Sequence, residues 1–158
     1  MKKFFMLILT LCIIGISSTS FAKIPQSQIA LGGITYGSSR AYVESVYGKP
    51  TSEENWSQNG QRLASVRYGE HLLVVYELSN NTVIDLACHE SNNLSTPAGV
   101  TCGMELAVLR KTYGSADNIY SAHGGTIYVY IGDKSINGSK GVLEFDVRNN
   151  VIYQIEIW

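Results

Sequence analysis

The chain has 158 residues, and its 12 basic and 13 acidic side chains give a formal net charge of −1 at pH 7. This length is typical of one domain that can bury a real hydrophobic core. The sequence contains no basic stripe, so we expect no nucleic-acid partner.

The first 22 residues have the pattern of a cleaved secretory signal. Lys2 and Lys3 form a positive end, Phe4 to Ile16 is an almost unbroken apolar run, and Ser20 and Ala22 occupy the positions that a signal peptidase reads. We therefore expect cleavage after Ala22 and a periplasmic or secreted protein. Loss of the two lysines leaves 10 basic against 13 acidic residues, a net charge of −3.

Two other interpretations of this segment fit less well. A membrane-spanning helix needs roughly 20 apolar residues, whereas this run is shorter and ends in a Ser/Thr cluster. A lipid-modified cysteine normally follows a small residue, but Cys12 follows Leu11 inside the apolar run. We expect no transmembrane segment once the signal is removed.

Residues 23–92 are predicted to form a short helix followed by strands. Ser38 or Ser39 can cap a helix whose apolar residues recur at three- and four-residue spacing as far as Tyr47, and Gly48 ends it. The hydrophobic period then changes to two, which indicates an antiparallel meander. Its strands are expected around Trp56 and over Arg62–Tyr68, Leu72–Leu78 and Thr82–His89.

Residues 93–158 show the same order of elements. The apolar spacing predicts a helix over Glu105–Tyr113, which Gly114 ends. Alternating patterns follow it. The expected strands lie around Tyr120 and over Ile127–Ile131, Val142–Val147 and Val151–Trp158.

Short motifs relate the two halves to each other. The segment from Gly33 to Gly37 matches that from Gly99 to Gly103, both helices end in Tyr-Gly, and both meanders contain an Asn-Asn turn, where Asn tolerates a positive φ. We therefore predict an α+β fold of two tandem repeats, 23–92 and 93–158. Each repeat is expected to be a short helical segment followed by a three- or four-stranded antiparallel β-meander.

Alignment of the repeats predicts which side chains face the core. Three apolar sets match, and we expect them to lie under the helices: Ala64, Val66 and Tyr68 with Ile127, Val129 and Ile131; Val74, Tyr76 and Leu78 with Leu143, Phe145 and Val147; Ile84, Leu86 and Cys88 with Tyr153, Ile155 and Ile157. The alternate side chains mix aromatic, aliphatic and carboxylate groups, which is the composition of an interface. Mutual covering of two sheets would bury the same side chains, and this alternative stays open.

The opposite face is therefore a predicted protein-binding site. Interface hot spots are enriched in Trp, Tyr and Arg. We expect Tyr128, Tyr130 and Trp158 as aromatic anchors, with Arg67, Glu144 and Asp146 as a charged rim.

Cys88 and Cys102 are the two cysteines that remain after signal cleavage. A pair of cysteines in an oxidising compartment is most simply a disulfide. Closing a loop of about 15 residues would stabilise the fold by ~3 kcal/mol. A catalytic cysteine is the alternative.

The sequence contains no recognisable catalytic or metal-binding motif. His71, His89 and His123 form no zinc pattern, and a zinc site needs three or four converging ligands. Cys88 and His89 are adjacent, so on a strand they point to opposite faces. Glu144 and Asp146 share a strand face, but an open sheet lacks the cleft that a glycosidase pair needs. We expect a non-catalytic protein without metal or cofactor, and a small Cys/His hydrolase is the enzymatic alternative.

The order of these motifs resembles a known group of exported proteins. The glycine segments at 33–37 and 99–103, with Tyr47-Gly48-Lys49-Pro50 and Tyr113-Gly114, are similar to the β-lactamase-inhibitor-protein-like fold and to the SmpA/OmlA outer-membrane assembly lipoproteins. The resemblance covers almost the whole mature chain. It implies binding of an extracellular enzyme or an envelope protein through an open sheet face. The tandem arrangement resembles the inhibitors, and the missing lipid-modified cysteine places the assembly role second.

Overall fold

The computed structural model describes residues 23–136 and 139–158. The predicted signal segment, residues 1–22, lies outside the described residues. Within them, no helix combines the length and the apolar character that crossing a membrane requires.

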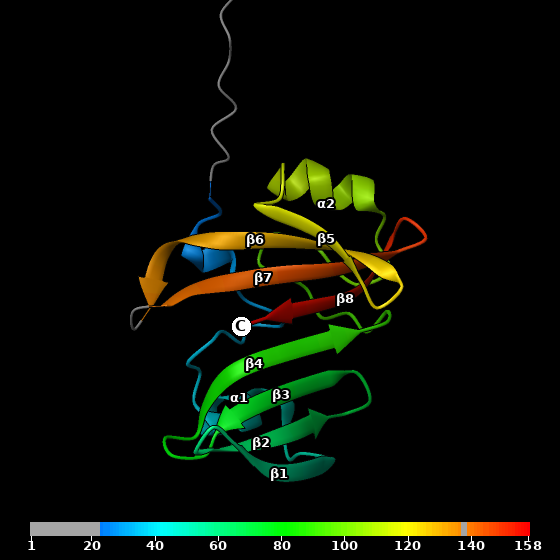
Figure 1. Ribbon diagram of the computed structural model, residues 1–158. Coiled ribbons are helices and arrows are strands. Elements are labelled where there is room, and N and C mark those ends of the chain that lie inside the picture. The colour runs from blue at the N-terminus through cyan, green and yellow to red at the C-terminus, as the bar shows by residue number, and fades with distance from the viewer. Residues whose placement is uncertain (1–22, 137–138) are drawn as a thin grey trace, which may run out of the picture.

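Two short helices and eight strands make up most of the described chain (Figure 1). The helical elements are the 3-10 turn η1 (Gln26–Gln28), α1 (Arg40–Tyr47) and α2 (Leu106–Tyr113). The strands are β1 (Ser52–Gln58), β2 (Gln61–Tyr68), β3 (Leu72–Glu77), β4 (Thr82–His89), β5 (Asn118–Ala122), β6 (Gly125–Ile136), β7 (Ser139–Arg148) and β8 (Val151–Ile157). The predicted helices and strands are therefore confirmed in place, to within a few residues at their ends.

All eight strands belong to one antiparallel sheet in the order β1-β2-β3-β4-β8-β7-β6-β5. Its centre is the pairing of β4 with β8, which aligns Leu86 to His89 with Ile157 to Gln154. The expectation of two repeats, each with its own helix and meander, is wrong, because this β4–β8 seam joins all the strands into a single sheet (Figure 1). Two separate meanders would each have left a central edge of unpaired backbone groups, and the seam pairs these edges with each other.

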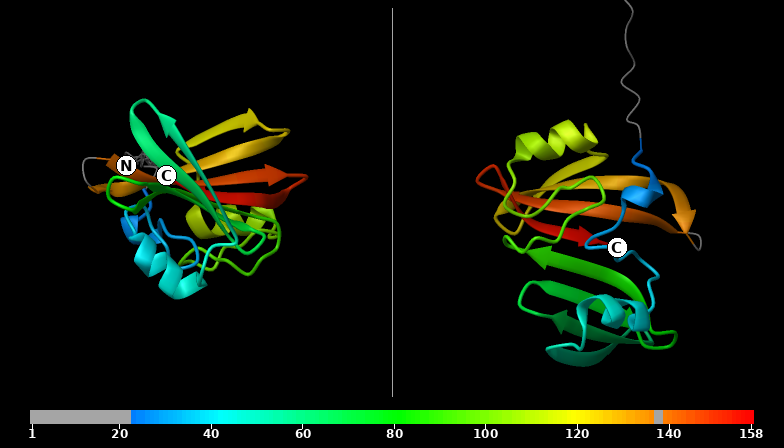
Figure 2. Two further views of the ribbon diagram at one scale, coloured as in Figure 1. Left: turned by 90° about the horizontal axis from the view of Figure 1, so that it is seen from below. Right: turned by 180° about the vertical axis from the view of Figure 1, so that it is seen from behind.

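Local sequence signals explain the ends of the helices. Ser39 caps α1, where its hydroxyl accepts a hydrogen bond from the Tyr42 amide, whereas the side chain of Glu105 makes no such bond at the start of α2. Gly48 and Gly114 follow the helices with φ values of 79° and 74°, a conformation that favours glycine. Both helices lie on the same face of the sheet (Figure 2, left).

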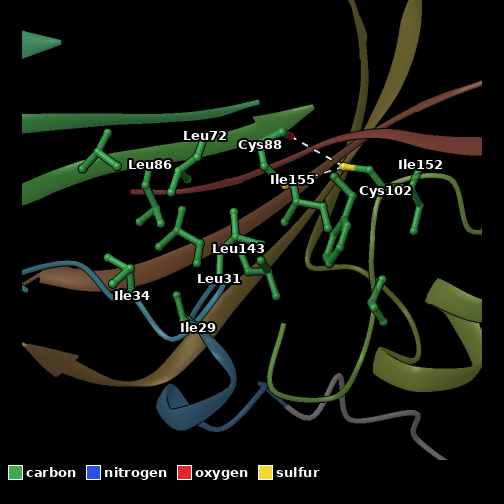
Figure 3. Close-up of a cluster of buried hydrophobic side chains, with 14 of the residues drawn as sticks. Ile29, Leu31, Ile34, Leu72, Leu86, Cys88, Cys102, Leu143, Ile152 and Ile155 are labelled. Atoms are coloured by element: carbon green, nitrogen blue, oxygen red, sulfur yellow. Dashed lines mark hydrogen bonds between the residues drawn. The ribbon is translucent and has the colours of Figure 1, made fainter. Parts of the chain in front are cut away.

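The hydrophobic core fills the space between this helix-covered face and the segments that pack on it. Ile29, Leu31 and Ile34 of the N-terminal segment lie among side chains of the central strands β3, β4, β7 and β8 and are completely buried (Figure 3). The same cluster contains Val43 of α1 and Leu109 of α2. One core therefore extends along the sheet from β2 to β6.

Two β-bulges change the predicted inward sets. The register shifts opposite Val75 and Tyr76 of β3, so Val83 rather than Ile84 is buried in the core. A second shift lies between Asp146 and Val147, and it places Ile152 in the core in the position expected of Tyr153. A bulge inserts one extra residue, which reverses the faces of the residues on one side of it.

Candidate functional site: the uncovered face of the sheet

The face of the sheet opposite α1 and α2 carries no helix, and we call it the uncovered face. One register row crosses all eight strands on this face. It runs through Ser52, Arg67, Leu73, Ala87, Glu156, Glu144, Val129 and Asn118. Arg67 and Glu144 thus lie on the same face but four strands apart, at a separation of roughly 19 Å for a strand spacing near 4.8 Å.

Tyr128 and Tyr130 do not belong to the uncovered face, and their expected outward orientation is wrong. Tyr128 lies opposite Phe145, Tyr130 lies opposite Leu143, and both tyrosines are in the core, 6% and 1% exposed. Their hydroxyls have partners there. That of Tyr130 donates to the carbonyl of Gly114 at 3.2 Å, and that of Tyr128 accepts from the Arg110 guanidinium at 3.2 Å.

Burial also changes the ionisation of Tyr130. Loss of water contact, followed by the nearby Tyr128, raises the pKa of the Tyr130 phenol to about 12. Its ring packs against those of Tyr113 and Phe145, with centroid distances of 5.4 Å and 5.9 Å. Tyr130 is therefore a neutral core residue and not a binding anchor.

The intervening residues of β6 form an apolar patch on the uncovered face. Ile127, Val129 and Val142 make a second buried cluster, separate from the main core, and Ala122 and Ile131 pack against it. This patch occupies the β6–β7 side of the face. The prediction that Ile127, Val129 and Ile131 lie under the helices is therefore wrong.

Trp158 stands at the middle of the sheet, directly after β8. Its side chain is 47% exposed and lines a cavity of about 340 Å³ together with Tyr36 and Ile84. Trp158 is therefore accessible to solvent, and its role as an anchor stays a prediction. A large aromatic group beside a hollow of this size can enter an interface with a partner.

Three carboxylates meet at the β4–β8 seam of the uncovered face. Glu144 and Glu156 are directly opposite each other on β7 and β8, and Asp85 lies on the same face of β4, two residues before the register partner of Glu156. Burial, and then the charges of Glu156 and Glu144, raises the pKa of Asp85 from 3.8 to about 7. Burial and Glu144 likewise raise the pKa of Glu156. Both shifts favour the protonated forms of these carboxyl groups.

Within the described part of the chain, no basic side chain forms an ion pair with any of these three carboxylates. Glu144 accepts only a hydrogen bond from the Tyr120 hydroxyl, and Glu156 accepts one from the Gln154 amide. A polar hollow of about 370 Å³ is lined by Glu144 and Glu156, and also by His123 and by Arg148, which pairs with Asp146. The centre of the face is therefore acidic and available to a cationic group.

Asp146 and Arg67 do not lie together on one charged rim of the binding site, although the sequence predicts this. Asp146 is only 5% exposed, and one of its oxygens receives the Arg148 guanidinium at 2.7 Å. Arg148 in turn lies 3.8 Å from the centroid of the Tyr153 ring. Asp146 thus serves an internal ion pair, whereas Arg67 is exposed on the distant β2 side of the face.

Cys88 and Cys102 are brought together but form no disulfide. Their sulfur atoms are 3.7 Å apart in the buried core (Figure 3). The hydrogen bond with Cys88, together with burial, raises the pKa of the Cys102 thiol. Cys88 lies in the core while His89 follows it on the other face, so the described structure does not assemble the Cys/His pair that a hydrolase would need. It also holds no cluster of three or more potential metal ligands.

Comparison with known proteins gives two similar solved structures. No protein-family model matches the chain, and no curated protein matches its sequence. A DUF4309 family protein, YjgB, from Bacillus subtilis is 15% identical over 85% of this chain and 86% of its own, with a TM-score of 0.46. A candidate beta-lactamase inhibitor protein from Streptococcus mutans is 12% identical over 77% and 83%, with a TM-score of 0.33. The function is therefore inferred from the residues of the uncovered face.

Proposed function

We propose that the chain is an exported, non-catalytic module that binds a protein on its uncovered face. The observation that carries this proposal is the meeting of Asp85, Glu144 and Glu156 without a basic partner, next to the exposed Trp158. Crowded carboxylates repel one another, and a cationic group from a partner would relieve this repulsion.

The composition of the rest of the face supports the same function. Trp158 is exposed at the seam beside the acidic centre, whereas the apolar cluster of β6 and β7 is already buried. Interfaces combine such an aromatic centre with polar surroundings. The partner we propose has a surface that presents Lys or Arg beside an apolar residue.

The nature of the partner separates two roles. An extracellular enzyme as partner would make the chain an inhibitor, whereas a resident envelope protein would make it an assembly component of the SmpA/OmlA type. Both roles use the same face and require no chemistry from the chain.

Site-specific photo-cross-linking in the native organism tests the proposal. A photoreactive phenylalanine analogue replaces Trp158, and in the control it replaces Tyr42, which is 48% exposed on α1 behind the sheet. We expect one protein to cross-link at position 158 and not at position 42, and the product to disappear when Glu144→Lys and Glu156→Lys are introduced. No product at 158, or equal products at both positions, contradicts the proposal. The identity of the captured protein distinguishes inhibitor from assembly component.

Export and oxidation of the cysteines are further parts of the proposal. The signal-like pattern of residues 1–22 supports export, and the sulfur separation of 3.7 Å between Cys88 and Cys102 supports a disulfide in an oxidising compartment. Mass spectrometry of the native protein should find an N-terminus within a residue or two of Lys23 and, without reductant, a peptide that links Cys88 to Cys102. A membrane-embedded form that keeps Met1, or two thiols that alkylate freely, would show that this part is incorrect.

A further inference from the structure

The two edges of the sheet are protected to different degrees. At one edge, β1 carries Glu53 and Glu54 and follows Pro50, and charges and prolines are features that keep edge strands from pairing with other chains. At the other edge, β5 has the sequence Asn-Ile-Tyr-Ser-Ala, which contains neither. The β5 edge is therefore open to an additional strand.

The hairpin geometry shows which backbone groups of β5 are free. His123 and Gly124 have φ values of 51° and 78°, so β5 and β6 are joined by a two-residue turn of type I′. The residues that flank such a turn, Ala122 and Gly125, form a hydrogen-bonded pair, and pairs alternate from there. The amide and carbonyl groups of Ile119 and Ser121 therefore point away from β6, toward the open edge.

A groove runs beside this edge on the helix-covered side of the sheet. It has a volume of about 700 Å³ and lies between the end of α2, the segment that follows it, and β5 (Figure 1). Tyr128 and Ile119 line it, and Ile119 is 57% exposed although its register partner Tyr128 is buried. An apolar side chain entering this groove would cover Ile119.

The charges at the groove select the partner. Arg110 and Asp117 are its charged lining residues, and Asp117 is already bonded to the Ile131 amide at 2.8 Å. The guanidinium of Arg110 lies 5.7 Å from the centroid of the Tyr128 ring and, among the described residues, has no carboxylate within ion-pair distance. Asp117 keeps its negative charge but already accepts a hydrogen bond, whereas the Arg110 guanidinium is the charged group of the groove that a carboxylate from a partner can reach.

We propose that β5 and this groove bind an extended peptide segment of a partner protein, which adds to the sheet as a ninth strand and directs an apolar and an acidic side chain into the groove. The apolar side chain covers Ile119, and the Asp or Glu side chain pairs with Arg110. Strand addition of this kind obtains affinity from backbone hydrogen bonds and specificity from alternate side chains. The surface is separate from the uncovered face, so either site can fail without the other.

A peptide selection tests this inference. The probe is a bead-bound library of random heptapeptides with amidated C-termini, which leaves only Asp and Glu as sources of a carboxylate. Enriched sequences should contain an acidic and an apolar residue two positions apart, because alternate residues of a strand share one face. They are then synthesised with a fluorescent label, and Kd is measured by anisotropy.

The decisive variant is Ser121→Pro, which removes an edge amide that β6 does not use. Its matched control is Ser57→Pro on β1, where Ser57 holds the same place before the Asn59-Gly60 turn at the protected edge. Ser121→Pro should raise Kd at least tenfold while Ser57→Pro leaves it unchanged. Thermal unfolding checks that both variants are folded, and Ile119→Glu replaces Ser121→Pro if that variant is not.

The charge pairing has its own readout. Arg110→Gln should raise Kd about tenfold, as expected for loss of one charged hydrogen bond. The same substitution should have no effect on a peptide in which Asp or Glu is changed to Asn or Gln. The inference would be overturned if no sequence were enriched, or if Ser121→Pro bound the selected peptides as tightly as the parent. It would also be overturned if the protein bound no peptide but formed a dimer that Ser121→Pro abolished.

Discussion

At the scale of single residues, Asp85 carries a clear electrostatic cost. Its carboxyl group is largely removed from water on β4 and lies beside Glu156 and Glu144, both of which are negatively charged when ionised. Burial and like charges both favour the protonated form. Ionisation of Asp85 therefore destabilises the folded chain. This cost is consistent with a role in binding a cationic group of a partner and not with a role in stabilising the fold.

This cost predicts a pH dependence of stability. The folded-state pKa of Asp85, about 7, lies above the unfolded value near 3.9, so between about pH 4 and pH 7 the folded chain holds a proton that the unfolded chain has released. The free energy of unfolding therefore falls as the pH rises through this window and is affected no further above it. Asp85→Asn removes the titrating group, so the variant should lose less stability than the parent from pH 4 to pH 7 in urea unfolding.

The control for this measurement is Glu54→Gln. Glu54 belongs to the same register row as Asp85, through Ser65 and Val75, but it is exposed on the edge strand β1. The substitution Glu54→Gln should leave the pH dependence of the free energy of unfolding the same as in the parent. Identical profiles for the parent and Asp85→Asn would contradict the crowding of these carboxylates.

At the scale of the elements, local patterns predicted the helices and strands well. Ser39, Gly48 and Gly114 each lie directly beside the helix end that they mark. The turn at Asn149 and Asn150 likewise follows from their tolerance of positive φ, with values of 49° and 65°. Each of these features depends only on neighbouring residues, and a single sequence contains all of them.

The orientation of β6 could not be obtained in this way. Its central residues alternate between aliphatic side chains and tyrosines, so a period of two shows that the faces differ but not which one is inward. Tyr128 and Tyr130 point inward because the core offers them polar partners, Arg110 and Gly114, which come from a distant segment of the chain. The two bulges escape prediction for a related reason, since each is defined only against the neighbouring strand.

The candidate site was predicted in part. The outward orientation of Trp158 and of Glu144 follows from alternation along β8 and β7, whereas the position of Glu156 opposite Glu144 follows only from the register of the two strands. The contribution of Asp85 depends on the β4–β8 seam, and pairing between strands far apart in the sequence leaves no local pattern. The ion pair of Asp146 with Arg148 could not be predicted either. The bulge between β7 and β8 turns Tyr153 toward Arg148, and this bulge has no signal in the sequence of one strand.

At the scale of the whole molecule, the seam makes the two halves of the chain depend on each other. The core cluster combines Val43 and Tyr76 from the first half with Leu109 and Phe145 from the second. Cys88 of β4 lies opposite Ile155 of β8, and both are completely buried. Separating the halves would expose one side of this core and the unpaired backbone of both central strands.

We therefore expect neither half to fold alone. The fragments 23–92 and 93–158 each have about 70 residues, a length at which one hydrophobic core supplies little net stability even when it is complete. Each fragment by itself should show no cooperative thermal transition in far-UV circular dichroism. An equimolar mixture should recover the sheet signal, elute as a 1:1 complex in gel filtration and unfold in one transition, which is the behaviour we also expect of the chain 23–158. Cooperative unfolding of the isolated fragment 23–92 would show instead that the first four strands form a domain of their own, and that the seam is a contact between finished units.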